Sequence, residues 1–170
     1  MKKILFLLIF VFNIEYSYSS NKIAYININH ILNNSIAGKS ISKHLQEIKQ
    51  KKIEEFKLIE EQLSDKKKDL DTKKNIIEEN EFNKQADLLN KEIISYRNEK
   101  KKFNKEIDNK KIKYTKIVLN TLNPIISKYV EENSISVVFP KKSIIIAKKN
   151  LDITKPIMDL LNSQIEKIDF

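Results

Sequence analysis

Glycine, proline and cysteine are scarce in this 170-residue chain, which has one glycine, three prolines and no cysteine. Between Gly38 and Pro124 neither common helix breaker occurs over about 85 residues, and apolar residues recur every three or four positions among charged ones. That period predicts α-helix. One unbroken helix would extend for about 125 Å at 1.5 Å per residue. A chain of this size favours a fold-back into two antiparallel helices.

The apolar spacing predicts a coiled coil between the two helices. Phe56, Leu63 and Leu70 fall seven residues apart in the first helix, as do Leu89 and Tyr96 in the second. Such a repeat indicates supercoiling about a narrow seam. Lysines interrupt the seam at positions 52, 66, 73, 100 and 110.

The interrupted seam predicts a thin, flexible arm over residues 37–122. Its turn is predicted at residues 78–83, Glu78 to Asn83. Asparagine tolerates the left-handed backbone that ends helices, and acidic side chains suit the first turn of the next helix.

Sequence motifs for catalysis are missing. The chain has no glycine-rich phosphate loop and no G-x-S-x-G sequence. His30 and His44 are not at metal-ligand spacing, and no cysteine or carboxylate cluster accompanies them. We therefore expect no enzymatic activity, no metal and no cofactor.

Residues 1–19 have the three-part pattern of a secretory signal. Lys2 and Lys3 precede an apolar run from Ile4 to Phe12, which is too short to span a bilayer. Small residues at Ser17 and Ser19 predict cleavage after Ser19. We expect an exported protein, and the lack of cysteine fits a compartment where thiols would oxidise.

The two ends of the mature chain predict a small α+β body. Residues 20–36 contain a strand and a short helical turn. Residues 123–170 contain a helix interrupted by Pro124, two strands at 135–139 and 143–147, and a final helix after Asp152. Asp152 or Thr154 can cap that helix, and Pro156 suits its first turn.

This body is undersized for independent stability. Roughly 65 residues make one core marginal, and exposed edges of apolar strands need a partner. We therefore expect self-association through the strands. The residues predicted to form the shared body are Ile23, Tyr25, Ile26, Val137, Val138, Ile144, Ile145 and Ile146.

The net charge of +9 predicts attraction to acidic partners and anionic surfaces. A candidate contact patch on the second helix consists of Phe82, Arg97, Lys100, Lys101, Lys102 and Lys105. The lysine run also fits an ordinary solvated helix face. Phe82, like the other arm aromatics, also fits seam packing.

Two sequence blocks resemble the Skp/OmpH family of periplasmic chaperones. The opening block runs from Lys22 to Asn27, with His30-Ile31-Leu32, Ser35 and Ala37-Gly38-Lys39. The closing block combines Ile135 to Phe139, Ile144 to Ala147 and Leu151 to Thr154, with Ile157 and Leu161. They flank a helical insert, and the resemblance covers essentially the whole mature chain.

The resemblance implies a homotrimer whose strands form a shared body, with three helical arms around a cavity. It implies an ATP-independent periplasmic holdase for unfolded outer-membrane β-barrel proteins. Contact with anionic lipid or lipopolysaccharide is a further family property, although no motif places its residues here. Specific nucleic-acid binding is not expected.

Two other classes remain open from the residues alone. A coiled-coil spacer or scaffold of the envelope would hold two partners apart. A basic nucleic-acid-binding coiled coil fits the lysine runs, although the chain lacks a recognisable binding module and the export signal opposes it.

Overall fold

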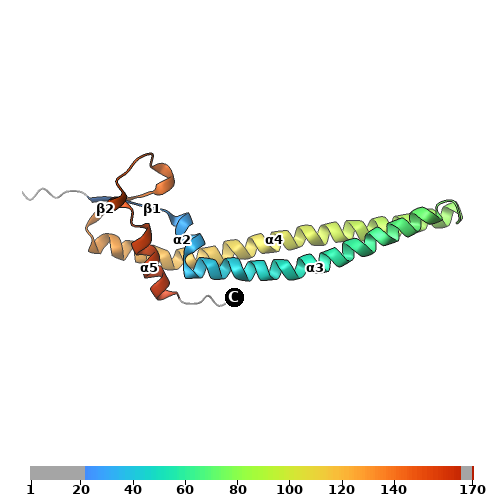
Figure 1. Ribbon diagram of the computed structural model, residues 1–170, viewed down its shortest axis with the longest axis horizontal. Coiled ribbons are helices and arrows are strands. Elements are labelled where there is room, and N and C mark those ends of the chain that lie inside the picture. Colours follow the sequence, from blue (N-terminus) through green and yellow to red (C-terminus); the bar gives the residue numbers. More distant parts are fainter. Residues whose placement is uncertain (1–21, 166–169) are drawn as a thin grey trace, which may run out of the picture.

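The computed structural model describes residues 22–165 and residue 170, in a long helical arm with a small body at one end (Figure 1). The elements in chain order are β1 (Lys22–Ile26), α2 (Ile28–Asn34), α3 (Ile36–Lys73), α4 (Glu79–Glu132), β2 (Ile135–Pro140), the 3-10 turns η1 (Lys141–Ser143) and η2 (Lys149–Leu151), and α5 (Thr154–Gln164). The predicted signal, residues 1–19, lies outside the described residues. The expected combination of small strand body, inserted helical hairpin and C-terminal helix is confirmed.

Helices α3 and α4 run antiparallel and form the arm (Figure 1). They are joined by residues 74–78, so the turn lies just before most of the predicted segment 78–83. Glu79 and Glu81 stand in the first turn of α4, where they complement the positive end of the helix dipole. The acidic residues mark the start of the second helix, and the turn precedes them.

Helix α4 continues through Pro124 into the body, where sequence analysis predicted an interruption. A proline removes one backbone hydrogen bond and is unfavourable inside a helix. Leu122 and Ile125 on either side of it are buried in the core. Their burial holds the helix together across the proline, and α4 ends only at Glu132.

The sheet has two parallel strands, β1 and β2, although they lie on opposite sides of the arm in sequence. Ile23 pairs with Val137 and Tyr25 with Phe139. The predicted third strand at 143–147 is wrong: Ser143 belongs to η1, and residues 144–148 have no regular structure. Tyr25 instead makes an isolated bridge to Asp152.

The core lies where β1, α2, α5 and the adjoining parts of α3 and α4 meet. Its fully buried apolar side chains are Ile31, Val118, Leu122, Ile157 and Leu161. Gly38 lets α2 and α3 approach closely, because a Cβ atom there would lie 1.8 Å from the carbonyl oxygen of Leu32. The base of the arm is thereby part of the body. No helix among the described residues is long and apolar enough to cross a membrane.

Candidate functional site

Three ion pairs join the two helices of the arm. Lys52 lies 2.8 Å from Glu99, Lys66 lies 2.6 Å from Glu92, and Lys100 lies 2.8 Å from Glu60. All three lysines stand where the sequence pattern has a gap in the apolar seam. Hydrogen bonds to Glu55 and Glu99 raise the pKa of Lys52 above its ordinary value. Three of the five gaps are therefore bridged by ion pairs between the helices, and both partners of each pair are accessible to water.

An aromatic cluster lies at the middle of the arm. The ring of Phe56 meets those of Tyr96 and Phe103 edge-on, with centroids 5.6 and 5.8 Å apart. The Tyr96 hydroxyl donates a hydrogen bond to Glu60, which also accepts one from Lys100. The bonds from Lys100 and Tyr96 lower the pKa of Glu60, whereas burial and the contact with Glu60 raise the pKa of Tyr96. These aromatics pack within the seam.

The structure separates the members of the predicted contact patch. Phe82 is half-buried in the first turn of α4, and Lys100 is paired with Glu60. Arg97, Lys101, Lys102 and Lys105 are exposed. Arg97, Lys101 and Lys105 recur every four residues and share one face of α4. The accessible basic surface is therefore narrower than the sequence suggested.

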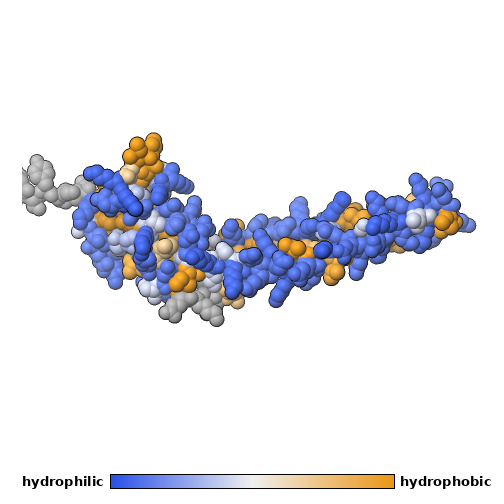
Figure 2. All heavy atoms as spheres, in the orientation of Figure 1, coloured by the Kyte–Doolittle hydropathy of each residue, from blue (hydrophilic) through white to orange (hydrophobic). Residues whose placement is uncertain are grey.

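The arm also carries exposed apolar side chains that the sequence pattern did not predict. Six are more than half exposed: Ile53, Leu58, Ile76, Leu88, Ile94 and Ile112. Figure 2 shows apolar spots scattered between the charged side chains of the arm. Four of the six stand next to a seam residue, as Leu88 does to Leu89. Neighbouring residues lie about 100° apart on a helix, so two adjacent apolar residues place one side chain in the seam and the other on the flank of the arm. These pairs of adjacent apolar residues are the sequence signal that could have predicted the exposed side chains.

One of these side chains lines a shallow hollow of about 190 Å³ between the helices. Leu88 lies there beside Leu70 and Leu89, with the Lys66–Glu92 pair among the lining residues. The hollow combines apolar surface with both signs of charge. It offers weak, adaptable contact rather than a shaped pocket for one small molecule.

The sheet of the body presents an apolar face. Ile23, Val137 and Phe139 are close to half exposed, and the strand register places them on one face. Ile145 and Ile146, at 99% and 90% exposure, lie in the loop after η1 and line one hollow with Tyr25 of β1. We call these five exposed apolar side chains, Ile23, Val137, Phe139, Ile145 and Ile146, the apolar face of the body.

Other residues predicted for self-association are occupied within the chain. Tyr25 and Ile26 are buried, while Val138 and Ile144 are partly buried. Val138 packs against the core, and Tyr25 lies beneath Lys141, whose amino group is 5.8 Å from the ring centroid. Only part of the predicted set is therefore available at the surface.

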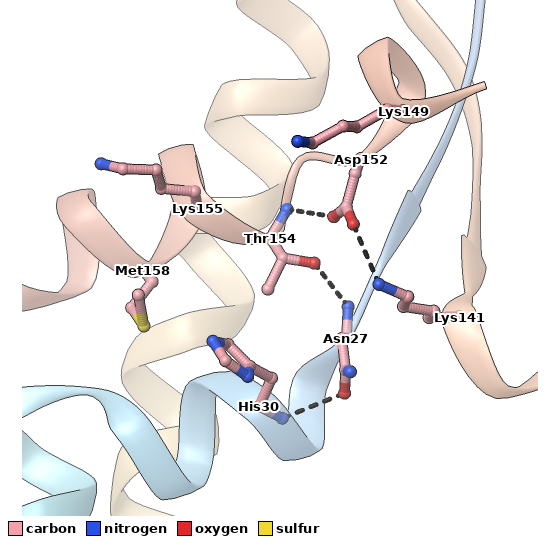
Figure 3. A pocket seen from close by; sticks show the side chains of 8 residues that line it. All are labelled: Asn27, His30, Lys141, Lys149, Asp152, Thr154, Lys155 and Met158. Atoms are coloured by element: carbon pink, nitrogen blue, oxygen red, sulfur yellow. Dashed lines mark hydrogen bonds and ion pairs between the residues drawn. The ribbon is translucent and has the colours of Figure 1, made fainter. Parts of the chain in front are cut away.

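A cluster of polar contacts, the polar junction, joins the two ends of the exposed loop, Lys141 and Asp152 (Figure 3). Lys141 lies 3.3 Å from Asp152, which accepts the backbone N–H of Thr154 at 2.9 Å. The Thr154 hydroxyl accepts the backbone N–H of Asn27 at 2.9 Å. Burial alone would raise the pKa of Asp152, but hydrogen bonds from Thr154 and Lys141 outweigh it and hold that pKa below its ordinary value. The junction joins β1, the loop and α5.

The junction borders a cavity of about 400 Å³, lined also by His30, Lys149 and Lys155. Its positive charge does not make a ready anion site, because Asp152 already occupies the N-terminus of α5 and Lys155 pairs with Asp159 at 2.6 Å. Within the described part of the chain, no group of three or more His, Cys, Asp or Glu side chains could hold a metal ion. The candidate functional site is therefore not a pocket but two exposed surfaces, the flanks of the arm and the apolar face of the body.

Comparison with known proteins agrees with this architecture. The crystal structure of an OmpH-like protein from Caulobacter crescentus CB15, described as an outer membrane chaperone, superposes with a TM-score of 0.76. The match has 22% sequence identity and covers 87% of this chain and 88% of that one, which shows a shared fold. A comparison with curated proteins found no match to the sequence. The family model for outer membrane proteins of the OmpH-like type matches residues 22–161. The chain belongs to the OmpH-like family.

Proposed function

We propose that this protein is an ATP-independent holdase that binds unfolded outer-membrane β-barrel proteins and prevents their aggregation in the periplasm. Family membership and a fold shared with a protein described as an outer membrane chaperone support a chaperone role. The proposal assigns no enzymatic step and no cofactor.

The observation that carries the proposal is the surface of the arm. Apolar side chains such as Leu58, Leu88 and Ile94 are exposed there, scattered over a mainly hydrophilic surface (Figure 2). Scattered apolar contacts can hold many sequences weakly, and the charges between them keep the surface soluble. A client with alternating apolar residues would find several such contacts along one arm.

A homotrimer is part of the proposal. The apolar face of the body would be covered by neighbouring copies, since an exposed strand edge and an apolar sheet surface favour association. The number three comes from the family resemblance. Three arms from one body would surround a client more completely than a single arm.

The proposed compartment is the periplasm, reached through the signal at residues 1–19 and cleavage after Ser19. The excess of basic residues would draw acidic clients and anionic lipid or lipopolysaccharide toward the arms by long-range attraction. This attraction weakens as the Debye length falls from about 10 Å at 0.1 M salt to about 3 Å at 1 M.

The test dilutes a urea-unfolded β-barrel protein into buffer with the mature protein and follows light scattering. We expect suppressed aggregation without ATP and no change when ATP is added. A spacer would leave the scattering unchanged, which would overturn the proposal. A nucleic-acid binder would bind DNA more tightly than the unfolded barrel and lose all client binding at 1 M salt.

Variants then separate apolar from charged contacts. The triple variant Leu58→Gln, Leu88→Gln and Ile94→Gln should lose most of its suppression at high salt, where apolar contacts dominate. The matched control Lys101→Gln, Lys102→Gln and Lys105→Gln should slow client association at low salt and match wild type at high salt. Both sets are exposed, so circular dichroism should show unchanged helix in each.

A further inference from the structure

Three aromatic rings from distant parts of the sequence meet at the base of the arm. The imidazole of His44 in α3 and the ring of the last residue, Phe170, stack with centroids 3.9 Å apart and planes 5° from parallel. Tyr114 of α4 meets both edge-on, at 6.0 Å from His44 and 5.2 Å from Phe170. Figure 1 places the C-terminal end of the chain beside this part of α3.

The three rings differ in how firmly the fold holds them. Tyr114 is buried and belongs to the core cluster, and His44 is half-buried on a long helix. Phe170 is about half exposed and belongs to no helix or strand. His44 and Tyr114 therefore form a preformed aromatic site, and Phe170 is its occupant rather than part of its framework.

We propose that the aromatic site, His44 and Tyr114, binds aromatic side chains of unfolded polypeptides, and that Phe170 is an internal occupant which a client displaces. The inference rests on the proposed holdase function and names one chemical class that the holdase recognises. Phe170 shows the recognition geometry: one face stacked on imidazole and one edge against a phenol ring.

Displacement follows from the way Phe170 is attached. A ring on the same chain competes with free ligand at an effective concentration, which is about millimolar for a short connection. A client held on the arm presents its own aromatic residues at comparable local concentration. Isolated aromatic groups therefore displace Phe170 only at concentrations of about millimolar or above, whereas clients already held elsewhere on the arm displace it at lower concentrations.

The experiment uses the lack of tryptophan in this chain. Phe170→Trp makes the residue at the aromatic site the sole indole of the protein and reports its environment through fluorescence. The probes are two soluble peptides, Ser-Phe-Ser and Ser-Leu-Ser with blocked ends, followed by an unfolded barrel protein whose tryptophans are replaced by phenylalanine. Displaced indole enters water, so emission shifts to longer wavelength and its anisotropy falls.

We expect the phenylalanine peptide to displace the indole at a concentration about two- to tenfold lower than the leucine peptide, the advantage of an aromatic pair. The barrel protein should displace it at about stoichiometric amounts. In Phe170→Ala, half-maximal client binding should occur at a lower concentration than in wild type. Adding His44→Ala to the reporter variant should abolish the peptide preference.

His30→Ala is the matched control, because His30 is the other histidine of the chain and lies on the surface of α2. It should preserve both the starting emission and the peptide preference. Equal displacement by the two peptides, or a preference that survives His44→Ala, would overturn the aromatic site. If the peptide displaces the indole but the protein fails to suppress aggregation, the aromatic site is supported and the holdase function is excluded. If the protein suppresses aggregation but the indole is not displaced, the holdase function is supported and the aromatic site is excluded.

Discussion

The body and the arm bury their apolar residues in different ways. The body collects side chains from five elements into one core, where Ile31, Leu122 and Ile157 have no exposed surface. The arm has a single seam between two helices, and its best-buried leucines, Leu70 and Leu89, retain 8% and 9% exposure. The body thus has a compact hydrophobic core, whereas the apolar contacts of the arm form a single row between two helices.

This difference in packing makes the body the more stable region and the arm the more adaptable one. Each body residue has neighbours on all sides, so removing one leaves a cavity. Most arm residues outside the seam are exposed to water, and three of the gaps in the seam are bridged by exposed ion pairs that contribute little stability. An arm of this kind can change shape while the body stays intact.

The largest expected effect comes from truncating the same residue type in both regions of α4. Leu122→Ala should lower the free energy of unfolding by about 2–5 kcal/mol, because it leaves a cavity in a closed core. Leu89→Ala should cost less than half as much, because water can fill the space. Urea unfolding followed by circular dichroism measures both. Equal losses would mean that the arm is packed as tightly as the body.

Gly38→Ala tests the close contact that roots the arm in the body. Alanine favours helix over glycine by about 1 kcal/mol, so propensity alone predicts stabilisation. The added Cβ would lie 1.8 Å from the Leu32 carbonyl oxygen and must push α2 away from α3. We expect a net loss of roughly 2–3 kcal/mol. Lys39→Ala, at the exposed neighbouring position, is the control and should be near neutral; a stabilised Gly38→Ala protein would contradict the packing of α2 on α3.

The ion pairs of the arm should contribute less. Lys66→Ala breaks the pair with Glu92 and should cost at most about 1 kcal/mol, since both side chains are largely exposed. The loss should shrink in 1 M salt, where charges are screened. Lys67→Ala is the neighbouring control. Thermal unfolding at two salt concentrations measures the effect, and a loss that persists at high salt would assign Lys66 a packing role.

The smallest expected effect on chain stability is that of Ile145→Asp. Because Ile145 is 99% exposed, the free energy of unfolding of the isolated chain should change by no more than about 0.5 kcal/mol. Self-association should nevertheless be lost, since a charge on the apolar face opposes its burial between copies. Ile112→Asp places the same charge on the arm and should leave association unchanged. Sedimentation velocity compares the three proteins, and an associated Ile145→Asp protein would exclude this loop from the interface.

Local sequence signals predicted most of the fold. The helix period and the lack of breakers predicted the hairpin, and the acidic residues predicted the first turn of α4 correctly even though the turn itself was placed too late. Pro156 stands in the first turn of α5 as expected. Pro124 misled the prediction, because burial of Leu122 and Ile125 outweighs a local backbone preference and depends on tertiary packing.

The remaining differences concern partners that a single sequence cannot supply. Residues 143–147 are apolar enough for a strand, but a strand needs a neighbour to pair with; one edge of β1 is paired with β2, and Tyr25 of β1 also makes its bridge to Asp152 rather than to these residues. In the candidate site, lysine positions were visible in the sequence, whereas the pairing of Lys100 with Glu60 depends on how the two helices align. The exposed members of the pairs of adjacent apolar residues required the seam register as well.

The pairing of β1 with β2 also sets an order of events. The strands touch, yet the whole arm lies between them in the chain, so β1 cannot pair until residues 135–140 have been synthesised and are free to meet it. Helical contacts close over short sequence distances and form quickly, whereas this parallel pairing closes a long loop. The arm should therefore be assembled while the body is still open, and pulse-labelled hydrogen exchange during refolding should show protected arm amides before those of β1. The folding chain therefore passes through a stage in which a finished arm is joined to an unfolded body.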